Sequence, residues 1–301
     1  MNVIEVENLH KRYEDHVAVD DVSFTVAAGE IFGILGPNGA GKTTTVECVS
    51  GLRARDGGLV RVAGIDPAED RDALRRVLGV QLQSSALPEK IKVWEALDLY
   101  ASFYPDPADW PELMARVGLA DKRNALFASL SGGQKQRLSV ALALVGKPRV
   151  AVLDELTTGL DPQSRRDTWE LVEQVRDSGV TIVLVTHFME EAERLCDRIA
   201  LIDTGRVAAI DTPDGLVARI GGGQTMRFRP SAEFDLALLT EIPEVADAGV
   251  EDGHVVVSGT GDLVPAVTLL LARHGVVPTG LRVEQATLDD AFVALTGRKI
   301  K

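Results

Sequence analysis

This chain of 301 residues has few cysteines, no long apolar run and no excess of positive charge. Its two cysteines, Cys48 and Cys196, are too few for a disulfide framework or, by themselves, a zinc site. The longest nearly continuous apolar stretches, Val180–Val185 and Leu263–Ala272, fall far short of the ~20 residues that a membrane helix needs. No basic leader precedes an apolar core near Met1, so we expect no secretory signal.

The charge balance argues against two further classes of partner. With 32 basic and 45 acidic residues the net charge is −13, which repels the phosphates of nucleic acids and of anionic lipid surfaces. We therefore expect neither a nucleic-acid partner nor direct adhesion to lipid. The composition, 45% hydrophobic and 26% charged, is that of an ordinary globular protein. The length suggests about two domains, and we expect a soluble, cytoplasmic chain.

Short apolar runs separated by helical patterns indicate an α/β domain over residues 1–220. Val150–Leu153 and Thr181–Val185 are continuous and rich in β-branched residues, as in parallel strands buried on both faces. Thr204-Gly205 lies between two further apolar runs and predicts a hairpin turn. The expected strands are 2–8, 21–26, 29–35, 150–153 and 181–185, and the expected helices are 44–52, 131–145 and 162–177.

The β pattern disappears after about residue 84. Apolar and aromatic residues recur at helical spacing within 91–104, and residues 112–117 resemble a second helix. We therefore expect a helical subdomain over about residues 84–145.

A glycine-rich linker at 221–224 separates a second pattern, residues 225–301. The order of elements there, βαββαβ and a closing helix, is that of a small α+β ferredoxin-like sandwich. The expected strands are 225–229, 245–250, 253–258 and 279–284, and the expected helices are 233–240, 262–273 and 287–296.

A phosphate-binding loop follows the strand that ends near residue 35. The residues are Gly36, Pro37, Asn38, Gly39, Ala40, Gly41, Lys42 and Thr43, with Thr44 continuing into a helix. They fit the pattern GxxxxGK[ST] between a strand and a helix. The glycines let backbone N–H groups point at phosphate oxygens, and the helix adds its positive N-terminal end. Lys42 would bridge the β- and γ-phosphates of a bound nucleotide, and the Thr43 hydroxyl would ligate Mg²⁺.

Two carboxylates end the apolar strand 150–153. Asp154 and Glu155 would lie beside the phosphate loop if that strand is central in a parallel sheet. Asp154 would hold Mg²⁺ through water, and Glu155 would polarise the attacking water as general base. Without the loop, a solvated strand end would be the simpler interpretation.

Ser131-Gly132-Gly133-Gln134 opens a helix, and Ser131 by itself is a good N-cap. After Leu130 these residues read LSGGQ, and they precede the strand ending in Asp154 and Glu155. Together with the phosphate loop, this set resembles the ATP-binding cassette (ABC) family over about residues 2–220.

The resemblance implies a P-loop cassette with a mixed sheet and a helical subdomain, working as a head-to-tail dimer that sandwiches two ATP molecules. The LSGGQ residues, Ser131 to Gln134, would face the γ-phosphate held by the other subunit. By the same resemblance Gln83 would contact Mg²⁺ and water, with Gln81 as the alternative assignment. Asp161 would link the two sites, His187 would contact the γ-phosphate, and Tyr13 would stack on adenine.

One residue departs from the family pattern. Leu156 stands where a proline usually follows the catalytic glutamate, which frees the backbone there. Other residues are expected to be structural: the two cysteines in the core, Trp94, Trp110 and Trp169 as packing residues, and Glu190, Glu191 and Glu193 on a solvated helix face.

Within the family, the closing residues 286–298 and the segment 81–88 resemble ATPase subunits of the daunorubicin-resistance type of drug exporter. That resemblance implies a separately encoded membrane permease as partner and a location on the inner face of the cell membrane through it. Intact motifs favour a homodimer of cassettes. The alternative is a soluble ABC ATPase acting on ribosomes or DNA, although such proteins usually carry two cassettes or long coiled coils.

Overall fold

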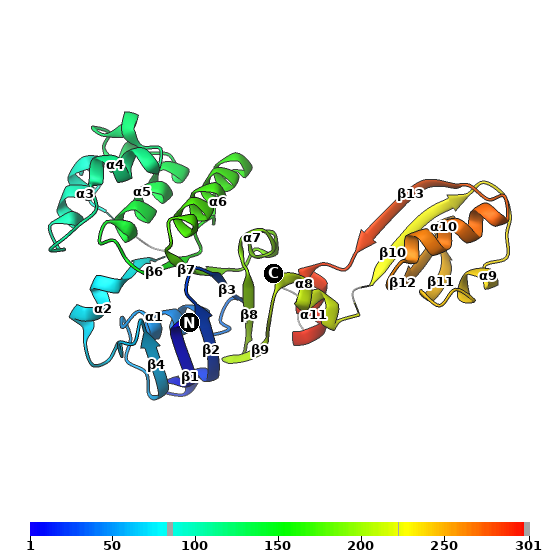
Figure 1. Ribbon diagram of the computed structural model, residues 1–301, viewed down its shortest axis with the longest axis horizontal. Coiled ribbons are helices and arrows are strands. Elements are labelled where there is room, and N and C mark those ends of the chain that lie inside the picture. The colour runs from blue at the N-terminus through cyan, green and yellow to red at the C-terminus, as the bar shows by residue number, and fades with distance from the viewer. Residues whose placement is uncertain (83–86, 222, 298–301) are drawn as a thin grey trace. The chain divides into compact units, whose positions relative to one another are not determined.

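The computed structural model describes residues 1–82, 87–221 and 223–297, and it divides into two compact units (Figure 1). The first unit runs to Pro213 and the second begins at Asp214. The division lies at the first residue of helix α8 (Pro213–Arg219), a few residues before the glycine-rich segment.

A nine-stranded mixed sheet forms the centre of the first unit, in the order β4-β1-β2-β9-β8-β3-β7-β6-β5. Its strands are β1 (Asn2–Tyr13), β2 (His16–Ala27), β3 (Ile31–Leu35), β4 (Gly57–Val62), β5 (Leu78–Gln81), β6 (Val150–Asp154), β7 (Thr181–Thr186), β8 (Arg198–Asp203) and β9 (Arg206–Asp211).

The parallel strands are those with continuous apolar sequences. Every residue of β3, β6 and β7 is buried, and β5, β6, β7, β3 and β8 pair in parallel in that order. Continuous β-branched runs suit strands covered on both faces. Because parallel strands end at one edge of the sheet, the phosphate loop after β3, the carboxylates after β6 and the histidine after β7 meet there.

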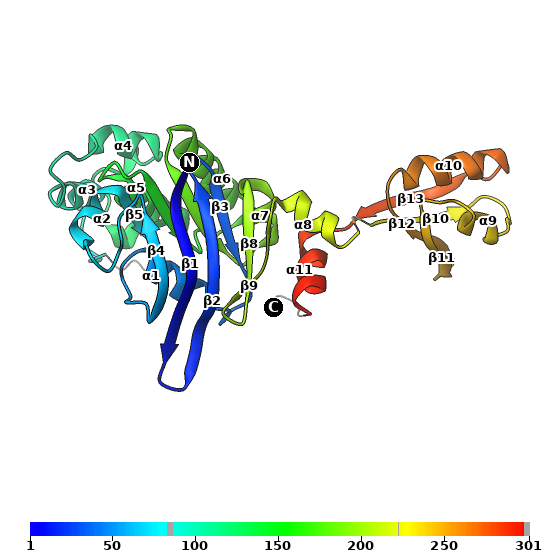
Figure 2. The ribbon, with the colours of Figure 1, turned by 60° about the horizontal axis from the view of Figure 1, so that its bottom comes forward.

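The antiparallel strands lie on the other side of β8. β1 and β2 run side by side as a long hairpin (Figure 2), and β8 and β9 form the hairpin predicted at Thr204-Gly205, whose φ angles are 49° and 74°. Strand β4 was not predicted, because Gly57 and Gly58 weaken its pattern and Val60 and Val62 are its only fully buried residues.

The helices of the first unit include the predicted group between β5 and β6. In that group α3, α4 and α5 contact one another (Figure 1), and Trp94 stacks on Trp110 at 6.4 Å between ring centroids. The helices are α1 (Lys42–Val49), α2 (Arg71–Val77), α3 (Val93–Ala101), α4 (Trp110–Arg116), α5 (Gly132–Leu144), α6 (Pro162–Asp177) and α7 (Met189–Leu195), with short 3-10 turns at Ala120–Lys122 and Phe127–Ser129.

One predicted surface residue is in the core. Glu191 of α7 is fully buried and accepts a hydrogen bond from Trp169 Nε1 at 3.0 Å, so the prediction of a solvated face is wrong for this residue. Cys48, Cys196 and Trp169 are buried, as expected. No helix in the part of the chain that the structure describes has both the length and the apolarity to span a membrane.

The second unit contains a four-stranded antiparallel sheet in the order β11-β12-β10-β13. Met226, Phe228, Val255 and Val257 project from one face of this sheet into a core that contains residues of α9 and α10. The predicted helix over 233–240 is shorter, because α9 forms only at its end. The elements are β10 (Gln224–Pro230), α9 (Ala237–Thr240), β11 (Val245–Glu251), β12 (His254–Gly259), α10 (Leu263–Arg273), β13 (Pro278–Gln285) and α11 (Leu288–Thr296).

Candidate functional site

Two glycines make the tight turn between β3 and α1 possible. A Cβ at Gly36 would overlap the Ile202 carbonyl oxygen, and one at Gly41 would overlap the Ala18 carbonyl oxygen. Gly41 also has a φ of 100°, which favours glycine. The loop therefore presses against neighbouring backbone, and its N–H groups are held at the N-terminus of α1.

Lys42 is folded onto this loop. Its Nζ donates hydrogen bonds to the Gly36 and Pro37 carbonyl oxygens at 2.7 and 3.1 Å, and the residue is only 5% exposed. Burial lowers the pKa of Lys42, while Glu155 and Asp154 oppose that shift. The ammonium and both carboxylates thus share one electrostatic environment.

Asp154 is buried at the end of β6, and one of its carboxylate oxygens makes no hydrogen bond to the described residues. The residue is 1% exposed, and its Oδ1 has no hydrogen-bond partner among the described residues. Burial first, and then Glu155, raise the pKa of Asp154 to about 6, against the effect of Lys42. A buried, partnerless carboxylate oxygen beside a phosphate loop fits a Mg²⁺ site, since this cation takes oxygen ligands and keeps several waters.

Gln81 holds the backbone beneath that carboxylate. Its side-chain oxygen accepts a hydrogen bond from the Asp154 N–H at 3.1 Å, and its Nε2 donates to the Leu82 carbonyl at 2.8 Å. Both polar atoms of the Gln81 side chain are therefore used in hydrogen bonds to the backbone, one of which joins β5 to β6. Gln83, the preferred candidate for the Mg²⁺ contact, lies outside the described residues.

Glu155 adopts a left-handed backbone with a φ of 49°, unusual for a residue with a side chain. Its N–H donates to the Val185 carbonyl oxygen at 2.9 Å, which ties it to β7. His187 follows β7, and its Nδ1 lies 3.2 Å from Glu155 Oε1. The structure therefore brings together the two residues predicted to act at the γ-phosphate. The next residue, Leu156, is fully buried.

A cavity of about 440 Å³ opens beside the phosphate loop. Tyr13 lines it at the end of β1, with the Arg53 guanidinium 5.0 Å and Lys11 Nζ 5.6 Å from the centre of its ring. His16 and Ala18 also line it. Neither was predicted to lie at the site, and the sequence indicates them only in that they follow Tyr13 in the hairpin. The lining is Tyr13, His16, Ala18, Asn38, Gly39, Gly41, Lys42, Thr43, Thr44 and Glu155.

The LSGGQ residues do not line this cavity in the chain as described. Ser131 and Gln134 cap α5 reciprocally, through hydrogen bonds of 3.3 Å to Ser131 Oγ and 3.0 Å to Gln134 Oε1. Ser131 and Gly132 are exposed. Ser131 therefore caps α5, as its residue type indicated. The exposed N-terminus of this helix is accessible to a group from outside this chain.

Asp161 has a similar structural role at α6. Its carboxylate accepts hydrogen bonds from the Gln163 and Ser164 N–H groups, both at 3.0 Å, and from Ser164 Oγ at 2.6 Å. The Ser164 hydroxyl is the main reason that the pKa of Asp161 is lowered. Asp161 is absent from the cavity lining of its own chain.

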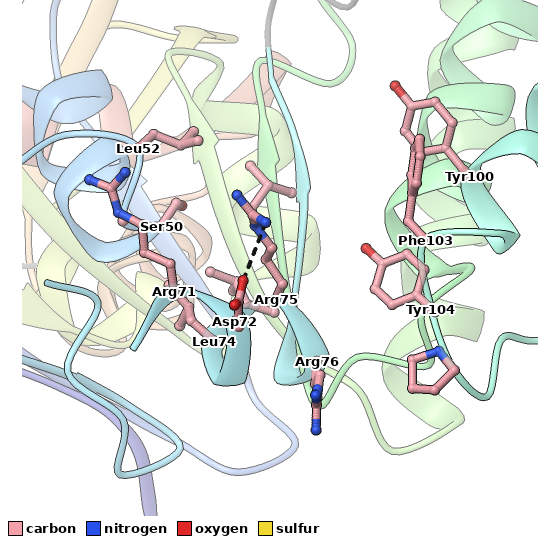
Figure 3. A pocket seen from close by; sticks show the side chains of 14 residues that line it. Ser50, Leu52, Arg71, Asp72, Leu74, Arg75, Arg76, Tyr100, Phe103 and Tyr104 are labelled. Atoms are coloured by element: carbon pink, nitrogen blue, oxygen red, sulfur yellow. Dashed lines mark hydrogen bonds and ion pairs between the residues drawn. The ribbon is translucent and has the colours of Figure 1, made fainter. Parts of the chain in front are cut away.

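A second cavity, of about 750 Å³, lies between α2 and the end of α3 (Figure 3). Leu52 and Phe103 are 56% and 68% exposed there, and Arg75 pairs with Asp72 at 3.5 Å. Its lining combines apolar, aromatic and basic side chains: Ser50, Leu52, Arg71, Asp72, Leu74, Arg75, Arg76, Leu78, Val80, Tyr100, Phe103, Tyr104 and Pro105, with the backbone of Gly51. The lining therefore offers apolar surface and positive charge at one place.

Known proteins similar to this chain share its whole length. The family model described as ABC transporter matches residues 19–158. The chain is 37% identical to Nod factor export ATP-binding protein I of Ralstonia nicotianae, over 99% of this chain and 95% of that protein. It is 33% identical to linearmycin resistance ATP-binding protein LnrL of Bacillus subtilis, over 99% and 100%. It is 35% identical to daunorubicin resistance ATP-binding protein DrrA3 of Streptomyces coeruleorubidus, over 99% and 98%.

Solved structures agree with this relationship. The structure of an ATP-binding subunit of an ABC transporter superposes with a TM-score of 0.66 at 29% identity, covering 73% of this chain and 93% of that one. A dimeric post-hydrolysis cassette, MJ0796 bound to ADP and Pi, gives 0.63 at 26% identity, covering 69% and 98%. The chain therefore belongs to the ABC transporter family, as an ATP-binding protein of the ABC-2 type of exporter.

Proposed function

We propose that this chain hydrolyses ATP in a dimer of two copies and thereby drives a separately encoded export permease. The observation that carries the proposal is the cluster of Lys42, Asp154, Glu155 and His187 beside the phosphate loop between β3 and α1. The proposal is supported by a cation, two carboxylates and an imidazole that lie near one another at the edge of the sheet where the phosphate loop lies.

The residues of the cluster have separate roles in this proposal. Lys42 would exchange its two carbonyl partners for β- and γ-phosphate oxygens. Thr43, which lines the cavity, and Asp154, whose Oδ1 has no partner among the described residues, would hold Mg²⁺, which would supply charge neutralisation at the phosphates. Glu155 would take a proton from the attacking water, and His187 would orient Glu155 through the 3.2 Å contact and lie against the γ-phosphate. Gln83 is proposed as a further Mg²⁺ contact.

The remaining residues of the proposed site would contact the adenine ring or act across the dimer. Tyr13 would stack on adenine, which discriminates poorly among bases. Ser131, Gly132, Gly133 and Gln134 would approach the γ-phosphate bound by the other copy. The exposure of Ser131 and Gly132 at the start of α5, where hydroxyl and N–H donors meet a positive helix end, supports that role. Asp161 would position the loop that joins the two sites.

We propose that the permease contacts the cavity between α2 and α3. Exposed Leu52 and Phe103 offer apolar surface, while Arg71, Arg75 and Arg76 around them would attract acidic residues (Figure 3). A cytoplasmic segment of the permease with apolar and acidic residues fits this lining, and it would keep the chain at the inner face of the membrane. The exported molecule would be a drug, an antibiotic or a lipid-like compound.

The second unit would be an accessory domain of ferredoxin-like fold. Its strand order β13-β10-β12-β11 and its antiparallel pairing support this assignment, because a βαββαβ chain forms that sheet when each helix crosses back over one face.

The first test uses Glu155→Gln. Loss of the general base should reduce turnover by about 10²–10⁴-fold while ATP binding, measured by equilibrium dialysis, is retained. The tagged variant is then recovered with ATP from detergent-solubilised cells of its source, and the main co-purifying protein is identified. A multi-span membrane protein is the expected partner. Ribosomal or chromosomal proteins without one would overturn the export function, and turnover like that of the natural protein would overturn the role of Glu155.

A further inference from the structure

The second unit carries a basic depression on the sheet face opposite its core. Met226, Phe228, Val255 and Val257 point into the core. The alternate residues, Arg227 and Arg229 of β10 and His254 of β12, therefore lie on the other face. With Arg282 of β13 they surround a cavity of about 560 Å³. Residues 225–297 contain four arginines in all, so three of the four are concentrated here in an acidic chain.

The strand register brings like charges together. Arg227 of β10 is directly opposite Arg282 of β13, and like charges in that relation destabilise an antiparallel pair. Arg229 lies two residues further along the same face. Folding therefore gathers positive charge here although local pairing does not favour it.

Little negative charge compensates the cluster. Arg227 meets Asp252 at 3.8 Å, but the Asp252 side chain is 95% exposed. Within the described residues, Arg229 and Arg282 have no ion pair. Glu284, which also lines the cavity, is the one acidic residue in that lining.

We propose that this depression binds a small soluble phosphorylated molecule, separate from the ATP site. Arginine side chains present planar forks of donors that match phosphate oxygens, and three of them around one cavity suit a diphosphate or two phosphate groups. The volume lies in the range of small-molecule sites. Glu284 would accept a hydrogen bond from a hydroxyl or amino group on the same molecule.

The shape and composition favour a solute over a lipid surface. A membrane-binding patch gains from basic residues that project toward the headgroups, whereas these side chains surround a hollow that also contains Glu284. The proposed ligand would therefore enter the depression from solution.

The probe is inorganic pyrophosphate, titrated by calorimetry into the full chain. The ATP site is first filled with a non-hydrolysable ATP analogue and an equal amount of Mg²⁺, so that the phosphate loop does not contribute. Saturable binding is expected. Arg282→Gln should weaken it by at least about tenfold, as expected for the loss of a charge-assisted pair. Glu284→Gln should tighten it by about threefold, because an exposed carboxylate that repels the phosphates is removed.

Arg273→Gln is the matched control. Arg273 is exposed at the end of α10, on the core side of the sheet, so its loss removes the same charge from the same unit without touching the depression. Unchanged affinity in this variant supports the proposal. An equal loss in Arg273→Gln and Arg282→Gln would overturn it, as would the absence of saturable binding. Sedimentation with vesicles containing phosphatidylglycerol, lost in Arg282→Gln but without pyrophosphate binding, would assign the surface to lipid and also overturn it.

Discussion

The surroundings of Asp154 and the backbone conformation of Glu155 both reduce the stability of the folded chain. A residue with a side chain held at a φ of 49°, as Glu155 is, costs of order 1 kcal/mol. Asp154 has a buried oxygen without a partner among the described residues, and burying such an atom costs about 1–3 kcal/mol. Such costs at adjacent positions indicate that this strand end is shaped for a ligand.

Asp154→Asn should therefore stabilise the nucleotide-free protein at pH 7.5, by about 1–2 kcal/mol. The pKa of Asp154 is raised from 3.8 to about 6 in the folded state, chiefly by burial. Between these values the folded state binds a proton that the unfolded chain does not, so the natural protein loses stability as pH rises through this window. The gain in the variant should be absent below pH 4, grow up to pH 6 and stay constant above.

Denaturant unfolding followed by tryptophan fluorescence measures this effect in the cassette alone, because Trp94, Trp110 and Trp169 all lie in the first unit. Asp98→Asn, on the exposed side of α3, is the control and should change stability little at any pH. An Asp154→Asn variant less stable than the natural protein at pH 7.5 would contradict the assignment of a penalised carboxylate.

Gly41→Ala should reduce ATP affinity more than tenfold. The new Cβ would overlap the Ala18 carbonyl oxygen, so the loop must move and its N–H groups lose their aim at the phosphates. Gly29→Ala is matched, since Gly29 also has a positive φ, 82°, but nothing lies within 4 Å of its added Cβ. Fluorescence titration with a labelled ATP analogue compares the two variants. Equal affinities in the two variants would contradict the prediction that the overlap at Gly41 displaces the loop.

At the scale of elements, β5 is joined to the site by one side chain. Gln81→Met keeps the length of that side chain but leaves the Asp154 N–H without its acceptor, which should cost about 1–3 kcal/mol. Mg²⁺-dependent ATP binding should weaken as the Asp154 carboxylate loses its fixed position. Gln174→Met, an exposed position on α6, controls for the change of residue type. Chemical denaturation and ATP titration with and without Mg²⁺ provide the two measurements, and an unchanged variant would remove Gln81 from the site.

Elements with a strong single period were predictable from sequence. The strands β3, β6 and β7 and the helices α3 and α5 lie where their apolar patterns indicated. The glycine–lysine loop could be predicted because the geometry of phosphate binding fixes the spacing of its residues. Strand β4 and helix α2 escaped because β4 has only two fully buried residues and α2 one, which leaves little pattern. Glu191 was misassigned because its burial depends on Trp169, which is distant in sequence.

For the candidate site, the sequence indicated residues but not the contacts between them. The motif spacing pointed to Lys42, Asp154 and Glu155, the family resemblance added His187, and parallel strands bring these positions to one edge of the sheet. The functions that motif spacing and resemblance assign to these residues remain predictions. Neither revealed that Gln81 braces Asp154, or that Arg53 and Lys11 flank Tyr13. Those contacts depend on side-chain packing between segments with no common motif, which sequence spacing does not encode.

At the scale of the whole molecule, the LSGGQ residues and the nucleotide cavity of one chain are separate. If a second copy completes each site, the specific ATPase activity must rise with protein concentration until the dimer is fully formed. Ser131→Arg should abolish this activity by placing a bulky side chain at the exposed start of α5, while ATP binding to the monomer is retained. Steady-state turnover is measured over a hundredfold range of concentration, beside ATP affinity by equilibrium dialysis. Ser129→Arg, also exposed but outside the helix cap, is the control. Activity per chain that is independent of concentration, or that survives Ser131→Arg, would require each chain to hydrolyse ATP with its own residues alone.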